Sequence, residues 1–190
     1  MAIFLCSDWH FNHDQEFIWK ERGFNSVTEM NEEIVKRHNE VVKPEDEVYV
    51  LGDLCMGTDI EANKKLIESM NGNLHIVLGN HDTVTREKMY LDCKNVFEIC
   101  GYATLKKYKK YTFYLSHYPT NTSNYDDDKH LRACTINLCG HTHTGYKFLE
   151  ILTNKQLSYH VDMEAHSCYP INLDDIIEDI KGEFYNDKRN

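Results

Sequence analysis

Prolines, linker-like segments and long apolar runs are all scarce in this chain of 190 residues. It has three prolines, no stretch that resembles a Pro/Gly/Ser linker, no repeat and no low-complexity block. These absences predict one domain over residues 1–190, long enough to bury a substantial core. The apolar run at residues 2–6 follows no basic segment and is too short for a signal peptide or a membrane span, so we expect no membrane association.

Cysteine pairs of the C-x-x-C type are also absent, and the total of seven cysteines is odd. Several cysteines stand within or next to apolar runs, where a free cysteine behaves as a small apolar residue. We therefore expect reduced cysteines in or near the core. Reduced cysteines are typical of a reducing compartment, which predicts a cytoplasmic protein.

Positive charge is in deficit, because 21 Lys and Arg face 31 Asp and Glu and the formal net charge is −10. An acidic surface disfavours nonspecific binding to nucleic acid, although bound divalent cations would reverse the field inside a pocket. The basic segment at residues 106–110 keeps nucleic acid open as a partner, but a solvated turn is the favoured interpretation. No pattern in the chain indicates an oligomeric state.

The first half of the chain alternates strand and helix patterns. Strands are predicted at residues 2–6, 47–51 and 74–78. Residues 8–25 show no clear period and predict a long loop or a short irregular helix. One helix is predicted after Ser26, which forms a capping-box pattern with Glu29, and another after Thr58 or Asp59. This order predicts a layered α/β fold with right-handed crossovers.

The second half of the chain has a different pattern, in which residues typical of turns separate short apolar runs. Two runs that flank residues 106–110 predict a hairpin, and two that flank residues 153–155 predict another. A strand is predicted at residues 135–139, and a last helix over residues 173–181 is expected to end at Gly182. We therefore expect antiparallel strands to follow the βαβαβ half.

Polar side chains follow five of the apolar strand candidates. They are Asp8 and His10, Asp53, Asn80 and His81, His117, and His141 and His143. Open α/β sheets bind ligands outside the carboxyl ends of their strands, so these groups are expected to converge on one site. The alternative for the segment CGHTH at residues 139–143 is a strand end with two exposed histidines, but the other strand ends favour one wall of a metal site.

The chemistry of this residue set indicates metal ions. It offers oxygen and nitrogen ligands without thiolate, which suits manganese, iron, zinc or nickel better than a cysteine-bound structural zinc. Seven candidate ligands exceed the needs of one open tetrahedral centre; they are Asp8, His10, Asp53, Asn80, His117, His141 and His143. They fit two divalent metals that share a carboxylate and lie about 3.5–4 Å apart, as in two-metal hydrolases. Such a pair lowers the pKa of a bound water and clamps phosphoryl oxygens; manganese is the metal that we expect first.

The same residues, in the same order, resemble the motifs of the calcineurin-like metallophosphoesterase superfamily. The matches are D-x-H at residues 8–10, G-D at 52–53, G-N-H-D at 79–82, the lone His117 and G-H-x-H at 140–143. Residues 8–13 and 116–119 also resemble small, cap-free phosphoesterases of bacteria and their phages. The chain lacks the D-R-G continuation of the Ser/Thr protein phosphatases after residue 53, which argues against protein-phosphatase activity.

The resemblance implies an αββα sandwich with a dinuclear metal site at the sheet edge. It assigns Asp8, His10 and His143 to the first metal, Asn80, His117 and His141 to the second, and Asp53 to a bridge between them. His81 would not bind metal but would donate a proton or hydrogen bond to the leaving oxygen, for which the titration range of histidine is suited. Asp82 either orients His81 or caps the next segment.

The function implied is hydrolysis of a small phosphate monoester or diester, with nucleotides and cyclic nucleotides among the candidate substrates. A metal-activated hydroxide would attack phosphorus while His81 assists the leaving group. Two alternatives stay open. One is a partner-binding protein that kept the fold and lost catalysis, and the other is a nuclease acting on single strands, against which the net charge weighs.

Several further polar residues allow two interpretations. His13 fits either a surface loop or a contact to the substrate phosphate. Arg22 could clamp a phosphate, but an exposed arginine in a polar loop is the favoured interpretation. His160, Asp162 and His166 look like a second cluster, which we assign to a hairpin face and a loop.

Overall fold

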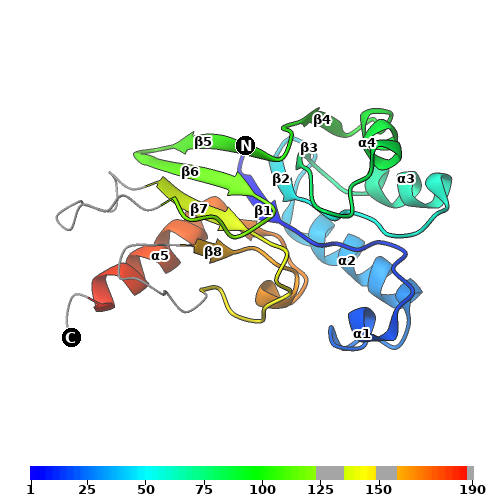
Figure 1. Ribbon diagram of the computed structural model, residues 1–190, viewed down its shortest axis with the longest axis horizontal. Coiled ribbons are helices and arrows are strands. Elements are labelled where there is room, and N and C mark those ends of the chain that lie inside the picture. Colours follow the sequence, from blue (N-terminus) through cyan, green and yellow to red (C-terminus); the bar gives the residue numbers. More distant parts are fainter. Residues whose placement is uncertain (123–134, 149–157, 188–190) are drawn as a thin grey trace.

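The computed structural model describes residues 1–122, 135–148 and 158–187, and its strands form two mixed sheets (Figure 1). The first sheet has the order β4-β3-β2-β1-β9. It comprises β1 (Ile3–Cys6), β2 (Glu47–Leu51), β3 (Asn73–Val77), β4 (Val96–Ile99) and β9 (Ile171–Asn172). Strands β1 to β4 are parallel, and β9 is antiparallel to β1. The carboxyl ends of β1, β2 and β3 therefore meet at one edge.

The second sheet has the order β5-β6-β7-β8. It comprises β5 (Ala103–Tyr108), β6 (Tyr111–Ser116), β7 (Thr135–Cys139) and β8 (Ser158–His160). The predicted hairpin of β5 and β6 is confirmed, but its turn is only Lys109 and Lys110, because residues 106 and 107 pair in β5. The expected antiparallel pairing is wrong for β7 and β8, which run parallel to β6 and β7 respectively. Apolar periodicity identifies a strand but not the direction of its neighbour.

The second predicted hairpin falls largely outside the described residues, including its turn at residues 153–155. On its described flanks, Phe148 and Tyr159 form an isolated antiparallel bridge.

The helices are α1 (Glu16–Trp19), α2 (Val27–Val41), α3 (Ile60–Glu68), α4 (Val84–Leu91) and α5 (Leu173–Asp187), with a short 3-10 helix η2 (Glu164–His166). Ser26 caps α2 as predicted, because its hydroxyl accepts from the Glu29 amide. The carboxylate of Glu29 reaches Asn25 rather than Ser26, so only half of the predicted capping box forms. Asp59 caps α3 in the same way, through the Ala62 amide.

Two hydrophobic clusters hold these layers together. Val48 and Val50 of β2 face the cluster that also contains the buried sides of α2 and α3. Tyr49 and Leu51, which alternate with them, face a cluster shared with Phe113 of the second sheet. Burial of each large apolar side chain stabilises the fold by roughly 1.5–3 kcal/mol. The predicted α/β sandwich with mixed sheets is thus confirmed, and the site edge belongs to strands that are buried on both faces.

Three elements depart from the sequence prediction. Helix α4 and strand β4 are present in the structure but were not among the predicted elements. In β4 the apolar Phe97 is 70% exposed, so apolar residues in this strand do not mark its buried face. Helix α5 runs past Gly182, where we expected its end. A glycine costs a helix about 1 kcal/mol, which the burial of Ile176 and Ile180 upstream outweighs.

The cysteines of the described residues are free thiols, and all but the half-buried Cys100 are buried. Burial raises the pKa of Cys55, Cys93 and Cys100 to about 11, which keeps these thiols protonated and unreactive. The expected reduced core cysteines are therefore confirmed, with Cys134 outside the described residues. In the described part of the chain, the helices are too short or too polar to cross a membrane.

His38 on α2 carries a pH-dependent share of the stability. It is 1% exposed, and its Nε2–H donates to the Asn71 carbonyl at 2.9 Å. Burial lowers the pKa of His38 to about 4. The unfolded chain, in contrast, binds a proton at this residue below about pH 6.5.

We therefore expect the free energy of unfolding to fall as the pH drops from about 6.5 towards 4, with at most about 1.4 kcal/mol per pH unit from His38. In His38→Gln this contribution is absent, so stability should depend less steeply on pH in that window. Urea unfolding at several pH values compares the two slopes directly, since other titrating groups are common to both proteins. Equal slopes would contradict the assignment.

Candidate metal centre

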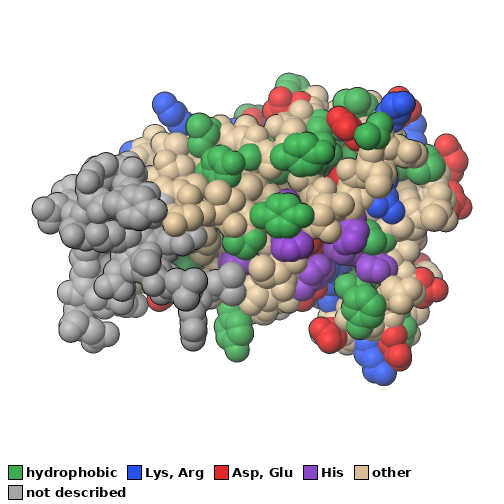
Figure 2. Space-filling model, in the orientation of Figure 1, with side chains coloured by type: hydrophobic (Ala, Val, Ile, Leu, Met, Phe, Trp, Pro, Cys, Tyr) green, Lys and Arg blue, Asp and Glu red, His purple; other side chains and the backbone are tan. Residues whose placement is uncertain are grey.

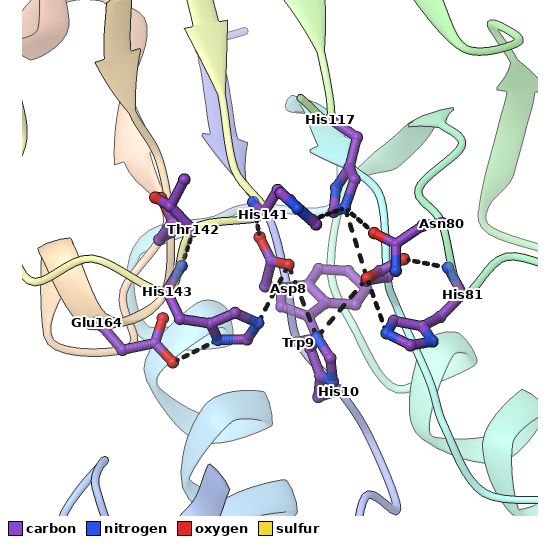
Figure 3. A network of polar contacts seen from close by, with 12 residues as sticks. Asp8, Trp9, His10, Asn80, His81, His117, His141, Thr142, His143 and Glu164 are labelled. Carbon is purple, nitrogen blue, oxygen red and sulfur yellow. Dashed lines mark hydrogen bonds and ion pairs between the residues drawn. The ribbon is translucent and has the colours of Figure 1, made fainter. Parts of the chain in front are cut away.

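The side chains that follow β1, β2, β3, β6 and β7 point into one space between the ends of the two sheets (Figure 3). Figure 2 shows the same convergence on the surface, where histidine side chains gather on one face. Asp8, His10, Asp53, His141 and His143 all have φ between +49° and +73°. Non-glycine residues rarely adopt this conformation, and such strain concentrates at functional sites.

The first part of the site is formed by Asp8, His10 and His143. Asp8 Oδ1 lies 3.6 Å from Nε2 of both imidazoles. Asp8 Oδ1 and His10 Nε2 are buried and have no hydrogen-bond partner among the described residues. The other carboxylate oxygen of Asp8 accepts the His141 amide at 2.9 Å, which fixes the direction of the free oxygen.

The second part is formed by Asn80, His117 and His141. His117 donates its Nδ1 proton to the Leu51 carbonyl at 2.8 Å, which leaves a lone pair on Nε2 in the neutral ring. This nitrogen lies 2.8 Å from Asn80 Oδ1 and 3.1 Å from His141 Nδ1. Lone pairs this close repel each other unless a proton or a cation lies between them.

Asp53 joins the two parts. Its Oδ1 accepts the His81 amide at 2.9 Å, and its Oδ2 lies 3.5 Å from His117 Nε2 and 3.8 Å from His10 Nε2. One oxygen of Asp53 therefore faces a nitrogen of each part. This placement is what a carboxylate shared by two cations requires.

The electrostatics of the two buried aspartates differ. Burial alone would raise the pKa of Asp8, but the His10, His143 and His117 imidazoles outweigh it and hold the pKa of Asp8 below its usual range. For Asp53, burial wins and its pKa rises above the usual value. Burial also lowers the pKa of His10 and of His141, which favours the neutral, ligating form of both rings.

The donor set fits divalent metal ions. Two groups of three potential ligand atoms each lie within 4.8 Å of one another: Asp8, His10 and His143, and Asp8, Asp53 and His117. Buried polar atoms without a partner are costly, and cations would satisfy the free Asp8 and His10 atoms together. The mixture of carboxylate and imidazole suits manganese, iron, zinc or nickel.

His81 lies at the open side of the site. Its side chain is 43% exposed, and its Nε2 is 3.9 Å from Asp53 Oδ2.

Asp82 plays neither of the parts predicted for it, since its Oδ2 accepts hydrogen bonds from the amides of Asp53 and Gly79 at 2.8 Å each. Its Oδ1 accepts from the Tyr90 hydroxyl at 2.6 Å, and Thr83 caps α4 instead. Asp82 thus fixes the backbone on which Asp53 stands.

Sequence comparison decides the family to which this arrangement belongs. A family model described as the calcineurin-like phosphoesterase superfamily domain matches residues 1–154. The chain belongs to the calcineurin-like phosphoesterase superfamily. All five motif blocks lie inside the matched span, so the resemblance drawn from them is confirmed.

Two similar proteins match nearly the whole length of this chain. An uncharacterised protein of Methanocaldococcus jannaschii is 29% identical over 178 residues, which cover 93% of this chain and 89% of that protein. A protein of unknown function from Aquifex aeolicus has a similar crystal structure, with a TM-score of 0.71 and 22% identity. That likeness covers 93% of this chain and 98% of the other and concerns the fold alone.

Residues beyond the matched span of the phosphoesterase model support the site from behind. Asp162 Oδ1 accepts the His143 amide at 3.0 Å, and Asp162 Oδ2 pairs with His160 at 3.0 Å. The ring of His166 donates to the His160 carbonyl. The sequence predicts a hairpin face and a loop for this cluster. His160 does end β8, but both His160 and Asp162 are fully buried, and Asp162 holds the loop that carries His143.

Other residues named from the sequence have different surroundings. His13 lies at the edge of the site, with its Nδ1 2.9 Å from Nδ1 of His10, and its pKa is lowered to about 4 by burial and by His10. Arg22 is neither exposed nor free to clamp a phosphate, because its buried guanidinium pairs with Glu164 at 2.8 Å. Lys106 pairs with Glu47, so the basic segment does not form a single free turn.

At Gly140, the loop that carries His141 and His143 passes very close to Asp8. A Cβ at this position would lie 2.2 Å from Ser7 Oγ and 2.4 Å from Asp8 Oδ2, so alanine would displace the carboxylate. We expect Gly140→Ala to lower the free energy of unfolding by about 1–3 kcal/mol. Gly145→Ala is the matched control, because a Cβ there meets no described atom within 4 Å and should change stability little. Chemical denaturation of both variants measures this, and equal stabilities would refute the close approach.

Proposed function

We propose that this protein is a metal-dependent phosphoesterase that hydrolyses small phosphate monoesters or diesters at a pair of divalent cations. The observation that carries the proposal is the position of Asp53 Oδ2, within 3.8 Å of one imidazole nitrogen from each part of the site. Membership of the superfamily supports the reaction type. Two-metal sites of this kind serve in-line displacement at phosphorus.

The ligands fall into two sets that share Asp53. Asp8, His10 and His143 would hold the first cation, and Asn80, His117 and His141 the second, with manganese expected first and iron, zinc or nickel as alternatives. When bound, the cations supply Lewis acidity, which neutralises phosphoryl oxygens and makes water a stronger nucleophile. The acidic chain needs this positive charge in order to accept an anionic ester.

His81 is placed to act on the leaving group. Its amide is fixed by Asp53, while its half-exposed ring lies on the open side of the site, where a substrate oxygen would depart. A proton from this ring to the leaving oxygen makes the leaving group an alcohol rather than an alkoxide. Tyr118 is 50% exposed, and the centre of its ring lies 4.5 Å from that of the His141 ring. This supports nucleotides and aryl esters among the substrates.

The proposal is tested by hydrolysis of p-nitrophenyl phosphate and bis-p-nitrophenyl phosphate by metal-free protein to which Mn²⁺, Fe²⁺, Zn²⁺ or Ni²⁺ is added in turn. We expect turnover that requires the metal and falls by more than about a hundredfold in Asp53→Asn, because that carboxylate faces both cation positions. Asp174→Asn, on the exposed Lys109 pair, is the matched control and should keep full activity. No turnover with any of the four metals would contradict the phosphoesterase proposal.

A leaving-group series tests His81 separately. p-Nitrophenolate departs without a proton, whereas an alkoxide needs one, so the loss in His81→Ala should grow with the pKa of the leaving alcohol. For alkyl esters we expect a loss of about 10²–10⁴-fold in kcat/KM. The same small loss across the whole series would show that His81 does not donate a proton.

A further inference from the structure

We propose that Glu164 and Arg22 are positioning residues that hold His143 in the orientation and tautomer required of a ligand to the first cation. The inference rests on the proposed function only in requiring that a cation binds beside Asp8, His10 and His143. Glu164 lies outside the span that matches the superfamily model, so the motifs do not assign it.

Glu164 fixes the tautomer of the His143 ring. Its Nδ1–H donates to Glu164 Oε1 at 3.0 Å, which leaves the lone pair of Nε2 directed at Asp8 Oδ1, 3.6 Å away (Figure 3). Without this acceptor the ring could rotate or carry its proton on the wrong nitrogen. Metal-binding histidines generally donate their second ring N–H to such an acceptor, which also raises the basicity of the ligand.

Glu164 is in turn held in place by Arg22. Arg22 donates its Nε–H to the same Oε1 at 2.8 Å, and its own side chain is 0% exposed. Its two terminal nitrogens donate to the Trp9 carbonyl at 3.0 Å and to the Asp8 carbonyl at 2.8 Å. One guanidinium therefore connects the backbone of Asp8 to the carboxylate that holds His143, and so sets the spacing of two ligands of one cation.

The charge of Arg22 is balanced by Glu164. A buried guanidinium needs a counter-charge, and Glu164 is the carboxylate that the structure places against it. The pair lies behind the ligands, so neither residue is available for a substrate phosphate. The Arg22 side chain is 0% exposed and that of Glu164 is 16% exposed, which suits a rigid support better than a binding surface.

The test is a calorimetric titration of metal-free protein with Mn²⁺, with Glu164→Gln and Glu164→Met compared with the wild type. We expect two binding events in the wild type, one of which weakens by about 10–100-fold in Glu164→Gln while the other stays within about twofold. Glu164→Met, which removes the acceptor entirely, should weaken the same event further. Glu98→Gln removes the carboxylate from a comparable pair with His75, 2.8 Å apart and outside the site, and should leave both events unchanged.

The outcomes separate the two proposals. If the wild type binds no cation, the proposed function fails. If the wild type binds two and both glutamate variants bind both with wild-type affinity, the positioning inference alone fails. Circular dichroism and the urea midpoint identify a variant that does not fold. ¹⁵N chemical shifts of the histidine rings then decide, because folded Glu164→Met, which lacks an acceptor for Nδ1–H, should alter the His143 tautomer population. An unaltered population would overturn the inference.

Discussion

Two buried aspartates, Asp8 and Asp53, set the conditions that the rest of this site must satisfy. They stand at the carboxyl ends of adjacent parallel strands, where each is at most 2% exposed, and the imidazoles of His10 and His117 lie within 4 Å of them. A buried carboxylate needs a cation or several donors, because desolvation of an unpaired charge costs several kcal/mol. The surrounding nitrogen atoms are held so that they offer lone pairs, and a pair of divalent cations would satisfy both kinds of group together.

The fold supplies the rigidity that this arrangement needs. Strands β1, β2 and β3 are buried on both faces, so their ends cannot move without disrupting the two hydrophobic clusters. Asp82 fixes the amides of Asp53 and Gly79, Asp162 fixes the amide of His143, and Arg22 fixes the carbonyl of Asp8. The left-handed conformations of the ligand residues are thus maintained by contacts from outside the ligand set.

The ligand set could be predicted from the sequence because each member directly follows an apolar strand, and parallel strand ends share one edge. The supporting residues could not be predicted in this way. Arg22 and Glu164 are separated by 142 positions, and neither stands in a motif or at a strand end. Asp82 belongs to a recognisable motif, but its hydrogen bond to the Asp53 amide depends on how closely β2 and β3 approach each other. The parallel direction of β7 and β8 was hidden for a similar reason, since a strand pattern does not identify its neighbour.

We have proposed that the two parts of the site bind two cations that share Asp53. Electron paramagnetic resonance of the protein titrated with Mn²⁺, combined with a count of bound metal per chain, tests it most directly. We expect two ions per chain, with a spectrum of exchange-coupled manganese that Asp53→Asn abolishes. A single ion at saturation, or two ions without coupling, would contradict the shared carboxylate and with it the arrangement proposed for this site.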